Sequence, residues 1–222
     1  MKSFIRYFTI IVICTLYAFP QLACSEDGYT QIDIGDGYYQ ITIENELGSY
    51  SVEYPSRYKK ELRKGLEYNP PFIHLMLDGP IKKEQTEVFD PGTGEIKTVV
   101  GERGTSSISI YTTNFKAYYG ESYSMVDRIE SLLEDEAKWE HFKLQERSPL
   151  TISGSQGELV VYLVDKLMPI PREDGKNMEY VRAVFFDYNN LTWEIEAICN
   201  EDIQDQVKAD FDHIIETFVI LR

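Results

Sequence analysis

Apolar and polar side chains alternate at every second position in several segments, and this pattern restricts the chain to a fold rich in β-sheet. In 39–43 and in 50–54, Tyr, Ile and Val alternate with Gln, Thr, Ser and Glu, and the turn-forming residues 45–48 separate the two segments. Successive residues of a strand point to opposite faces of a sheet, so this alternation indicates one buried and one wet face. The two segments therefore predict an antiparallel hairpin.

Further segments predict more strands of the same kind. Residues 72–77 and 180–188 are apolar on both faces, which indicates interior strands. Alternation or apolar runs also predict strands at 86–89, 96–100, 107–112, 159–163 and 191–198, with a tight turn at Asn189-Asn190. The charged arms of 84–100 flank a turn at 90–94 that contains Asp, Pro and Gly, so this segment predicts a hairpin projecting from the body.

Two segments instead have the 3.6-residue period of an amphipathic helix. Residues 124–140 begin with Ser124 and Asp127 in a capping relation and carry an apolar stripe of Met125, Ile129, Leu132 and Leu133. Residues 202–216 place their apolar side chains on one face over four turns. The basic segment 57–64 is expected to be helical as well. Together these patterns predict one α+β domain over 38–222, with a single antiparallel β-sheet and helices packed on it.

The first 23 residues predict export. They contain Lys2 and Arg6, no acidic residue, and an apolar run from 8 to 19, as a secretory signal peptide does. The run is short for a membrane span, which makes a retained signal anchor the lesser interpretation.

The residues Gln21-Leu22-Ala23-Cys24 that follow the apolar run resemble the bacterial lipobox, in which the cysteine is acylated and becomes the new N-terminus. The positions three and two before the cysteine depart from the usual Leu and small residue, and the alternative is a plain signal peptide cut near Ala23. We expect lipid attachment at Cys24, a flexible spacer over 24–37, and a location on the outer face of the cell membrane or in the secreted fraction.

Charge and cysteine content exclude some classes of partner and chemistry. Removing residues 1–23 changes the net charge from −15 to −17, which repels phosphate backbones and argues against nucleic acid as a partner. Cys14 lies in the signal segment and Cys24 is the expected acylation site, so Cys199 is left alone in the domain. It alternates with Trp193, Ile195 and Ala197, which predicts a buried, structural cysteine.

No set of residues predicts catalysis, a cofactor or a metal site. His74, His141 and His213 are far apart and lack the short spacing of metal ligands. Ser155 lies in a glycine-containing segment, but the glycine two positions before a nucleophile-elbow serine is replaced by Ser153, so a turn between strands is the better interpretation.

Two local patterns resemble the PsbP-like proteins, a class that includes the Mog1-type domains. The Tyr50-Ser51-Val52-Glu53-Tyr54-Pro55-Ser56 segment is similar to that family's aromatic strand ending in Tyr-Pro-Ser, and 211–220 is similar to its last helix and short terminal strand. Tyr58 stands where many relatives have Trp, and the 84–100 hairpin has the character of an insertion. The resemblance implies an α/β/α layered domain that binds protein partners, which in better-known members are photosystem assemblies and a small GTPase, and is not an enzyme.

Two functions follow as hypotheses. The favoured one is an exported, membrane-anchored lipoprotein whose non-enzymatic domain binds an extracytoplasmic protein or a small ligand, with the membrane contacted through the lipid. Binding is then expected at the 84–100 hairpin or the 168–179 loop, because loops held by a rigid sheet display recognition residues. The alternative is a secreted or surface hydrolase that assembles dispersed carboxylates, which would show as a deep pocket with two carboxylates of separated pKa.

Overall fold

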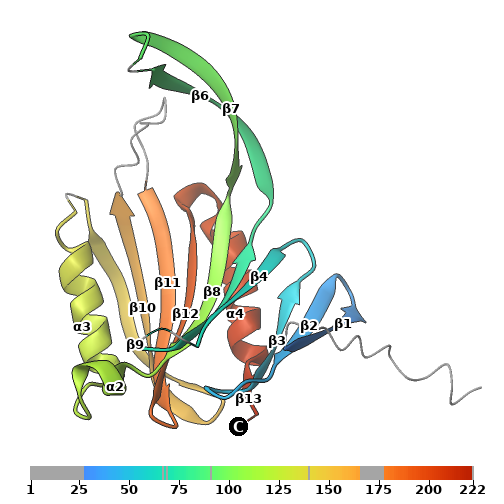
Figure 1. The fold of residues 1–222 in the computed structure, drawn as a ribbon, viewed down its shortest axis with the longest axis vertical. Coiled ribbons are helices and arrows are strands. Elements are labelled where there is room, and N and C mark those ends of the chain that lie inside the picture. Colours follow the sequence, from blue (N-terminus) through green and yellow to red (C-terminus); the bar gives the residue numbers. More distant parts are fainter. Residues whose placement is uncertain are drawn as a thin grey trace, which may run out of the picture.

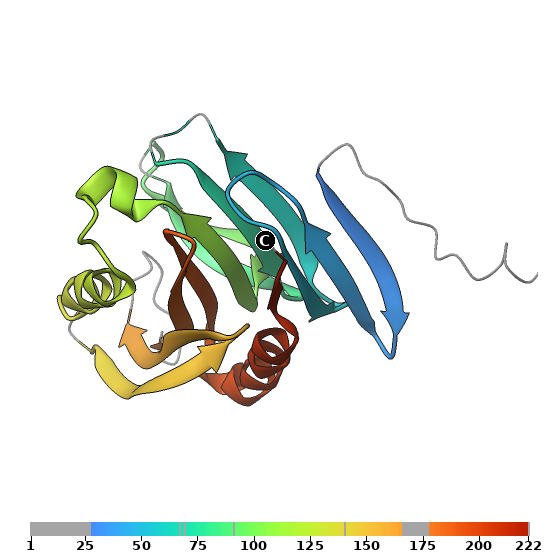
Figure 2. The ribbon, with the colours of Figure 1, turned by 90° about the horizontal axis from the view of Figure 1, so that it is seen from below.

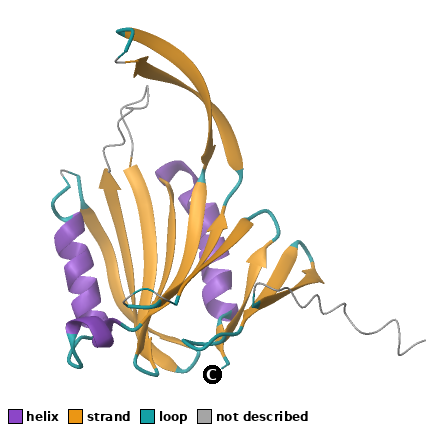
Figure 3. Cartoon of the chain, in the orientation of Figure 1, coloured by secondary structure: helices purple, strands orange, loops and turns teal. Residues whose placement is uncertain are grey.

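The computed structural model describes residues 28–221 apart from 67, 69, 91, 140 and 166–177, and its elements are mostly strands (Figures 1 and 3). The strands are β1 (Tyr29–Gly35), β2 (Tyr38–Ile43), β3 (Tyr50–Pro55), β4 (Lys59–Gly65), β5 (Phe72–Asp78), β6 (Ile81–Asp90), β7 (Glu95–Gly104), β8 (Ser106–Thr113), β9 (Lys143–Ile152), β10 (Ser155–Asp165), β11 (Met178–Tyr188), β12 (Leu191–Asn200) and β13 (Val219–Ile220). The helical elements are α2 (Phe115–Tyr119), α3 (Met125–Glu136), the 3₁₀ turn η1 (Glu201–Ile203) and α4 (Gln204–Thr217).

The strands form two body sheets and a separate ribbon, and every pairing between described strands is antiparallel. One sheet has the order β1-β2-β3-β13, the other has the order β4-β5-β8-β12-β11-β10-β9, and β6 pairs with β7 as a two-stranded ribbon. The predicted α+β class is confirmed, but the single sheet is wrong. Pro55 ends β3, and a turn at Ser56 and Arg57 directs the chain into β4, which belongs to the other sheet.

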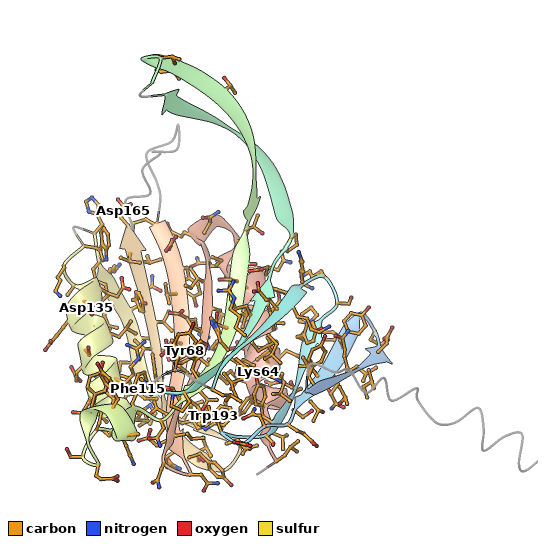
Figure 4. All side chains as sticks on the ribbon, viewed as in Figure 1. Lys64, Tyr68, Phe115, Asp135, Asp165 and Trp193 are labelled. Atoms are coloured by element: carbon orange, nitrogen blue, oxygen red, sulfur yellow. The ribbon has the colours of Figure 1, made fainter. Side chains whose placement is uncertain are left out.

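Aromatic rings join the two body sheets in the core. Trp193 of β12 is fully buried, and its ring lies 5.5 Å from that of Tyr50 in β3, 5.9 Å from that of Phe186 in β11 and 5.7 Å from that of Phe218 after α4. Trp193 lies at the lower end of the body in Figure 4. Such ring clusters bury large apolar areas, so the sheets and the end of α4 share one core.

Helix α4 covers the core side of the seven-stranded sheet, as the apolar face of 202–216 predicts. Its Val207, Phe211 and Ile214 are buried in the core that contains Trp193. The helix is also held by its buried Asp210, which accepts hydrogen bonds from the side chains of Arg57 and Tyr58 at the turn between β3 and β4. The predicted helix is confirmed, and its contacts explain how the two sheets are fixed to one another.

Helix α3 packs on the opposite face of the seven-stranded sheet, over β10 and β11. The predicted capping relation is present, because the Ser124 side chain accepts from the Asp127 backbone while the Asp127 carboxylate accepts from the Ser124 backbone. The predicted stripe packs on this face around Ile129, which is fully buried. On the outer side, Lys138 Nζ pairs with Asp135 Oδ1 at 2.6 Å.

Three strands were not predicted. Residues 29–35, assigned to the flexible spacer 24–37, form β1 in register with β2, and seen from below β1 lies on the side of the molecule away from α3 (Figure 2). The segment 57–64, predicted to be helical, contains most of β4. Residues 143–152 form β9, a segment for which no element was predicted.

The expected signal peptide at 1–23 and the acylation site Cys24 lie outside the described residues, as do residues 168–177 of the loop proposed for binding. Within the described part of the chain, no helix has both the length and the apolarity that a membrane crossing requires.

Candidate functional site

A row of polar and aromatic side chains crosses the part of the seven-stranded sheet that α3 leaves uncovered. The register places Arg63 of β4 opposite His74 of β5, His74 opposite Tyr111 of β8, and Tyr111 opposite Glu194 of β12. Side chains directly opposite one another on one face are close enough to interact. We call these four residues the polar row.

Aromatic contacts hold the centre of the polar row. The rings of Tyr111 and His74 meet edge to face at 5.7 Å, and Phe72, two residues before His74 in β5, stacks on Tyr111 at 5.9 Å. Tyr68, labelled in Figure 4, continues the series by contacting Phe72 at 5.7 Å and is 62% exposed. His74, Phe72 and Tyr111 are only partly buried, so the rings present an accessible aromatic surface.

An ion pair bounds each end of the polar row. At the β12 end, Arg128 of α3 donates from Nε to Glu194 Oε2 at 3.1 Å, and its Nη2 lies 3.0 Å from the same oxygen. The Arg128 guanidinium also lies over the ring of Phe115 in α2, at 5.7 Å. At the β4 end, Arg63 Nε donates to Glu61 Oε1 at 2.7 Å, with both side chains exposed. One end is therefore a desolvated pair and the other a solvated pair.

Burial sets the protonation of the polar row. It raises the pKa of Glu194 above its usual range, an effect that the neighbouring Arg128 opposes. It lowers the pKa of His74, and Arg63 lowers it further, so His74 is neutral at pH 7. It also raises the pKa of Tyr111, which therefore keeps its hydroxyl proton. His74 and Tyr111 thus offer neutral donors and acceptors beside aromatic rings, between charged ends at Arg63 and Glu194, a combination suited to binding a polar surface.

The β6–β7 ribbon continues the two central strands of this face. Between β5 and β6, Gly79 N donates to Ser106 O at 2.8 Å, and Thr105 N donates to Pro80 O at 3.2 Å, so the ladder of β5 and β8 runs on into the ribbon. A Cβ atom on Gly79 would lie 3.0 Å from Ser106 O and closer still to the Ser106 side chain, so the approach requires glycine. The ribbon rises above the body in Figure 1.

The ribbon confirms the hairpin predicted for 84–100, and it is longer than predicted. Its ladder runs from Ile81 opposite Gly104 to Asp90 opposite Glu95. Ile96, near the tip, is 67% exposed. The ribbon therefore adds an apolar contact point to the polar face from which it extends.

The other residues considered in the sequence have structural positions. Cys199 is buried, as predicted. Ser155 begins β10 directly after a tight turn at Ser153 and Gly154, both of which have positive φ, so the turn interpretation is confirmed. The Asn189-Asn190 turn is confirmed in the same way.

The three histidines are not brought together. His74 belongs to the polar row, His141 lies in the turn after α3, and His213 of α4 lies 3.2 Å from a Glu53 carboxylate oxygen. No cluster of three or more His, Cys, Asp or Glu side chains that could hold a metal ion occurs among the described residues. The sequence singled out His74 but not its neighbours in the polar row, because only the strand register brings them together.

Comparison with known proteins concerns the fold. No family model matches the chain, and no curated protein matches it. Solved structures that are similar include cyanobacterial PsbP from Synechocystis, at 12% identity over 89% of this chain and 95% of PsbP with a TM-score of 0.44. They also include LpqN, involved in cell envelope biogenesis of Mycobacterium tuberculosis, at 11% identity over 91% of this chain and 89% of LpqN with a TM-score of 0.38.

A third similar structure is a protein of unknown function from Pseudomonas aeruginosa, at 18% identity over 68% of this chain and 90% of that protein, with a TM-score of 0.36. At these identities the likeness concerns the general architecture alone and says nothing about activity or partner.

Proposed function

We propose that this chain is an exported binding protein, tethered to the membrane through Cys24, that holds an extracytoplasmic protein on its β6–β7 ribbon and the adjoining polar row. The observation that carries the proposal is the ribbon, a two-stranded sheet of its own with ten residues in each strand. An isolated pair of strands is marginally stable in water and buries little apolar area. Its length is therefore not explained by a contribution to the body's stability, whereas a projecting, twisted ribbon gives a partner two faces to contact.

The alternative of a hydrolase is less well supported. The raised pKa of Glu194 arises from burial beside the cation Arg128, which is the arrangement of a structural ion pair. Glu194 lies on a sheet face whose neighbouring side chains, such as Tyr111 and His74, are partly exposed. A catalytic acid would need a second carboxylate with a separated pKa in the same enclosed space.

The tether in this proposal is short. The strand β1 begins at Tyr29, five residues after Cys24. Five residues span at most about 18 Å even when fully extended. Acylation of Cys24 would thus hold the four-stranded sheet close to the headgroups and keep the orientation of the ribbon restricted. Mass spectrometry of the mature N-terminus tests this part, and an unmodified terminus at Ser25 would contradict it.

A photo-crosslinking experiment tests the ribbon directly. A benzoylphenylalanine placed at Ile96 should crosslink to one dominant extracytoplasmic protein in intact cells, because Ile96 is exposed near the tip. The matched control is the same probe at Val126 on α3, an apolar side chain that is also exposed. Equal crosslinking from both positions, or none from Ile96, would argue against the ribbon as the binding element.

Deletion of the ribbon separates binding from folding. Removing residues 85–99 and closing the gap with a short glycine-containing turn should leave the thermal transition nearly unchanged, because the deleted segment belongs to neither body sheet. The same deletion should abolish capture of the protein crosslinked from position 96. Unfolding of the variant would show that the ribbon is part of the core, and unchanged capture would remove it from the proposed function.

A further inference from the structure

A small groove lies on the core side of the seven-stranded sheet, between its β9 edge and helix α4. Its volume is about 340 Å³, which is at the lower end of the range for small-molecule pockets. It is lined by Val161 of β10 and by side chains from β9, β11 and α4. The wall residues are Gln145, Glu146, Tyr180, Arg182, Gln204, Asp205 and Lys208.

Arg182 is a fixed cation in this groove. Its side chain is only 12% exposed, its Nη2 donates to Asp212 Oδ1 at 2.8 Å, and its guanidinium lies over the Phe211 ring at 5.6 Å. The buried Nε has no hydrogen-bond partner. Asp212 therefore shares the Arg182 charge, and the rigid guanidinium can face a ligand carboxylate only through the part of its fork that Asp212 does not occupy.

Two opposite charges on α4 complete the groove without pairing to each other. Asp205 and Lys208 are three residues apart on α4, where side chains can meet, but no hydrogen bond or ion pair of either occurs among the described contacts. Glu146 of β9 adds a second carboxylate, which accepts from Ser148 Oγ at 2.8 Å. The walls therefore hold two cations and two anions within one small volume, and the Asp212 carboxylate paired with Arg182 adds a third anion beside them.

We propose that this groove binds the zwitterionic head of an α-amino acid. The carboxylate of the ligand pairs with Arg182 and Lys208, and its ammonium group pairs with Asp205 and Glu146. The mixed charges of the walls disfavour a simple anion, which Asp205 and Glu146 repel, and a simple cation leaves Lys208 without a counter-charge. The side chain of the ligand projects outward along the open side of the groove, beside Tyr180. This site is separate from the ribbon and does not depend on it.

Calorimetric titration of the purified exported protein tests the charge requirement. L-Alanine and L-glutamine are the zwitterionic probes, N-acetyl-L-alanine carries only the negative charge, and L-alaninamide carries only the positive charge. Each single-charge analogue should bind at least about tenfold more weakly than L-alanine, since one charged hydrogen-bonded contact is lost. Alanyl-alanine tests the size of the head, because its two charges are further apart, and it should also bind more weakly.

Exposed residues provide variants that leave the fold intact. Lys208→Gln and Asp205→Asn should each weaken L-alanine binding about tenfold without moving the thermal transition. Lys59→Gln is the control, because Lys59 is an exposed lysine on β4, at the opposite edge of the same sheet. Equal binding of L-alanine and its single-charge analogues, no binding of L-alanine, or unchanged affinity in both groove variants would each overturn the proposal. Loss of amino-acid binding would leave crosslinking from Ile96 unaffected.

Discussion

One face of the seven-stranded sheet has two halves of opposite chemistry. Beneath α3, over β10 and β11, the face is apolar and buried, and its side chains are Val160, Tyr162, Val164, Val181, Ala183 and Phe185. Over β12, β8, β5 and β4 the same face carries Glu194, Glu196, Ser107, Ser109, Tyr111, Phe72, His74, Met76, Glu61 and Arg63. Both halves belong to one continuous hydrogen-bonded sheet.

The difference shows that the open half is not a site left vacant by a missing helix. A face prepared for a second helix would carry apolar side chains, as the covered half does. The open half instead combines rings with hydrogen-bonding groups, the composition of the rim and centre of a transient interface. Arg128 marks the boundary, since it extends from the covering helix α3 to Glu194 on the first uncovered strand.

The largest expected loss of stability comes from truncating a buried side chain in the covered half of the face. Phe185→Ala should lower the free energy of unfolding by about 3–5 kcal/mol, because Phe185 is fully buried beneath α3. His74→Ala in the open half should cost less than about 1 kcal/mol. Urea unfolding of the two variants makes the comparison, and similar losses would mean that the open half is core as well.

Breaking the ion pair between Arg128 and Glu194 should have the next largest effect on the free energy of unfolding, and this effect should depend on pH. Arg128→Ala leaves Glu194 buried without its cation, at a cost of about 2–3 kcal/mol when the partial exposure of Arg128 is considered. Loss of Arg128 also raises the pKa of Glu194 further, since burial then acts alone.

The sign of the pH dependence follows from that shift. A carboxyl group whose folded pKa is raised binds its proton more tightly in the folded state, so stability falls as pH rises from the unfolded pKa through the folded one. The cost of Arg128→Ala should therefore be larger at pH 8 than at pH 5. Glu194→Gln in the same background should remove this pH dependence, and a cost that is independent of pH would contradict the assignment.

A smaller effect is expected from removing the cap of the covering helix. Ser124→Ala deletes the side-chain acceptor for Asp127 N and should cost about 1 kcal/mol. Ser124→Asp retains an acceptor and is the matched control. Thermal unfolding of the two variants measures the loss of stability. Equal losses for Ser124→Ala and Ser124→Asp would argue against the capping explanation.

The smallest effect concerns protonation within the polar row. The pKa of His74 is lowered by burial and by Arg63, so neutral His74 is favoured in the folded state and its contribution to stability is lost as pH falls through and below about 6.5. An NMR titration of the His74 ring should give a pKa below about 6.5. Arg63→Gln should move that pKa upward, and a downward shift or none would show that Arg63 does not act on His74.

The strands that the sequence did not reveal share one position. β1, β4 and β9 each form an edge of their sheet, whereas the predicted strands β5, β8, β10, β11 and β12 lie inside the seven-stranded sheet. Edge strands are kept polar because unpaired edges promote aggregation. In β4 this produces Lys59, Lys60, Arg63 and Lys64 around Leu62, a pattern that reads as a basic helix.

The polar row could not be predicted for a different reason. Its members lie on β4, β5, β8 and β12, and only the register of three strand pairings places them side by side. A shift of one residue in any pairing would move the side chain to the other face. The two-sheet arrangement depends likewise on the change of chain direction after Pro55, which carries the chain from one sheet into the other. The local pattern of apolar and polar residues does not specify that change of direction.

The ring cluster around Trp193 also makes the fluorescence of this residue a probe of the contact between the two sheets. The two tryptophans of the chain are Trp193, whose neighbours come from β3, β11 and the end of α4, and Trp139, partly exposed just beyond α3 on the other side of the seven-stranded sheet. Quenching by iodide should therefore reach Trp139 and spare Trp193. Since parting the two sheets opens the surroundings of Trp193, the loss of this protection is an optical signal for the separation of the sheets.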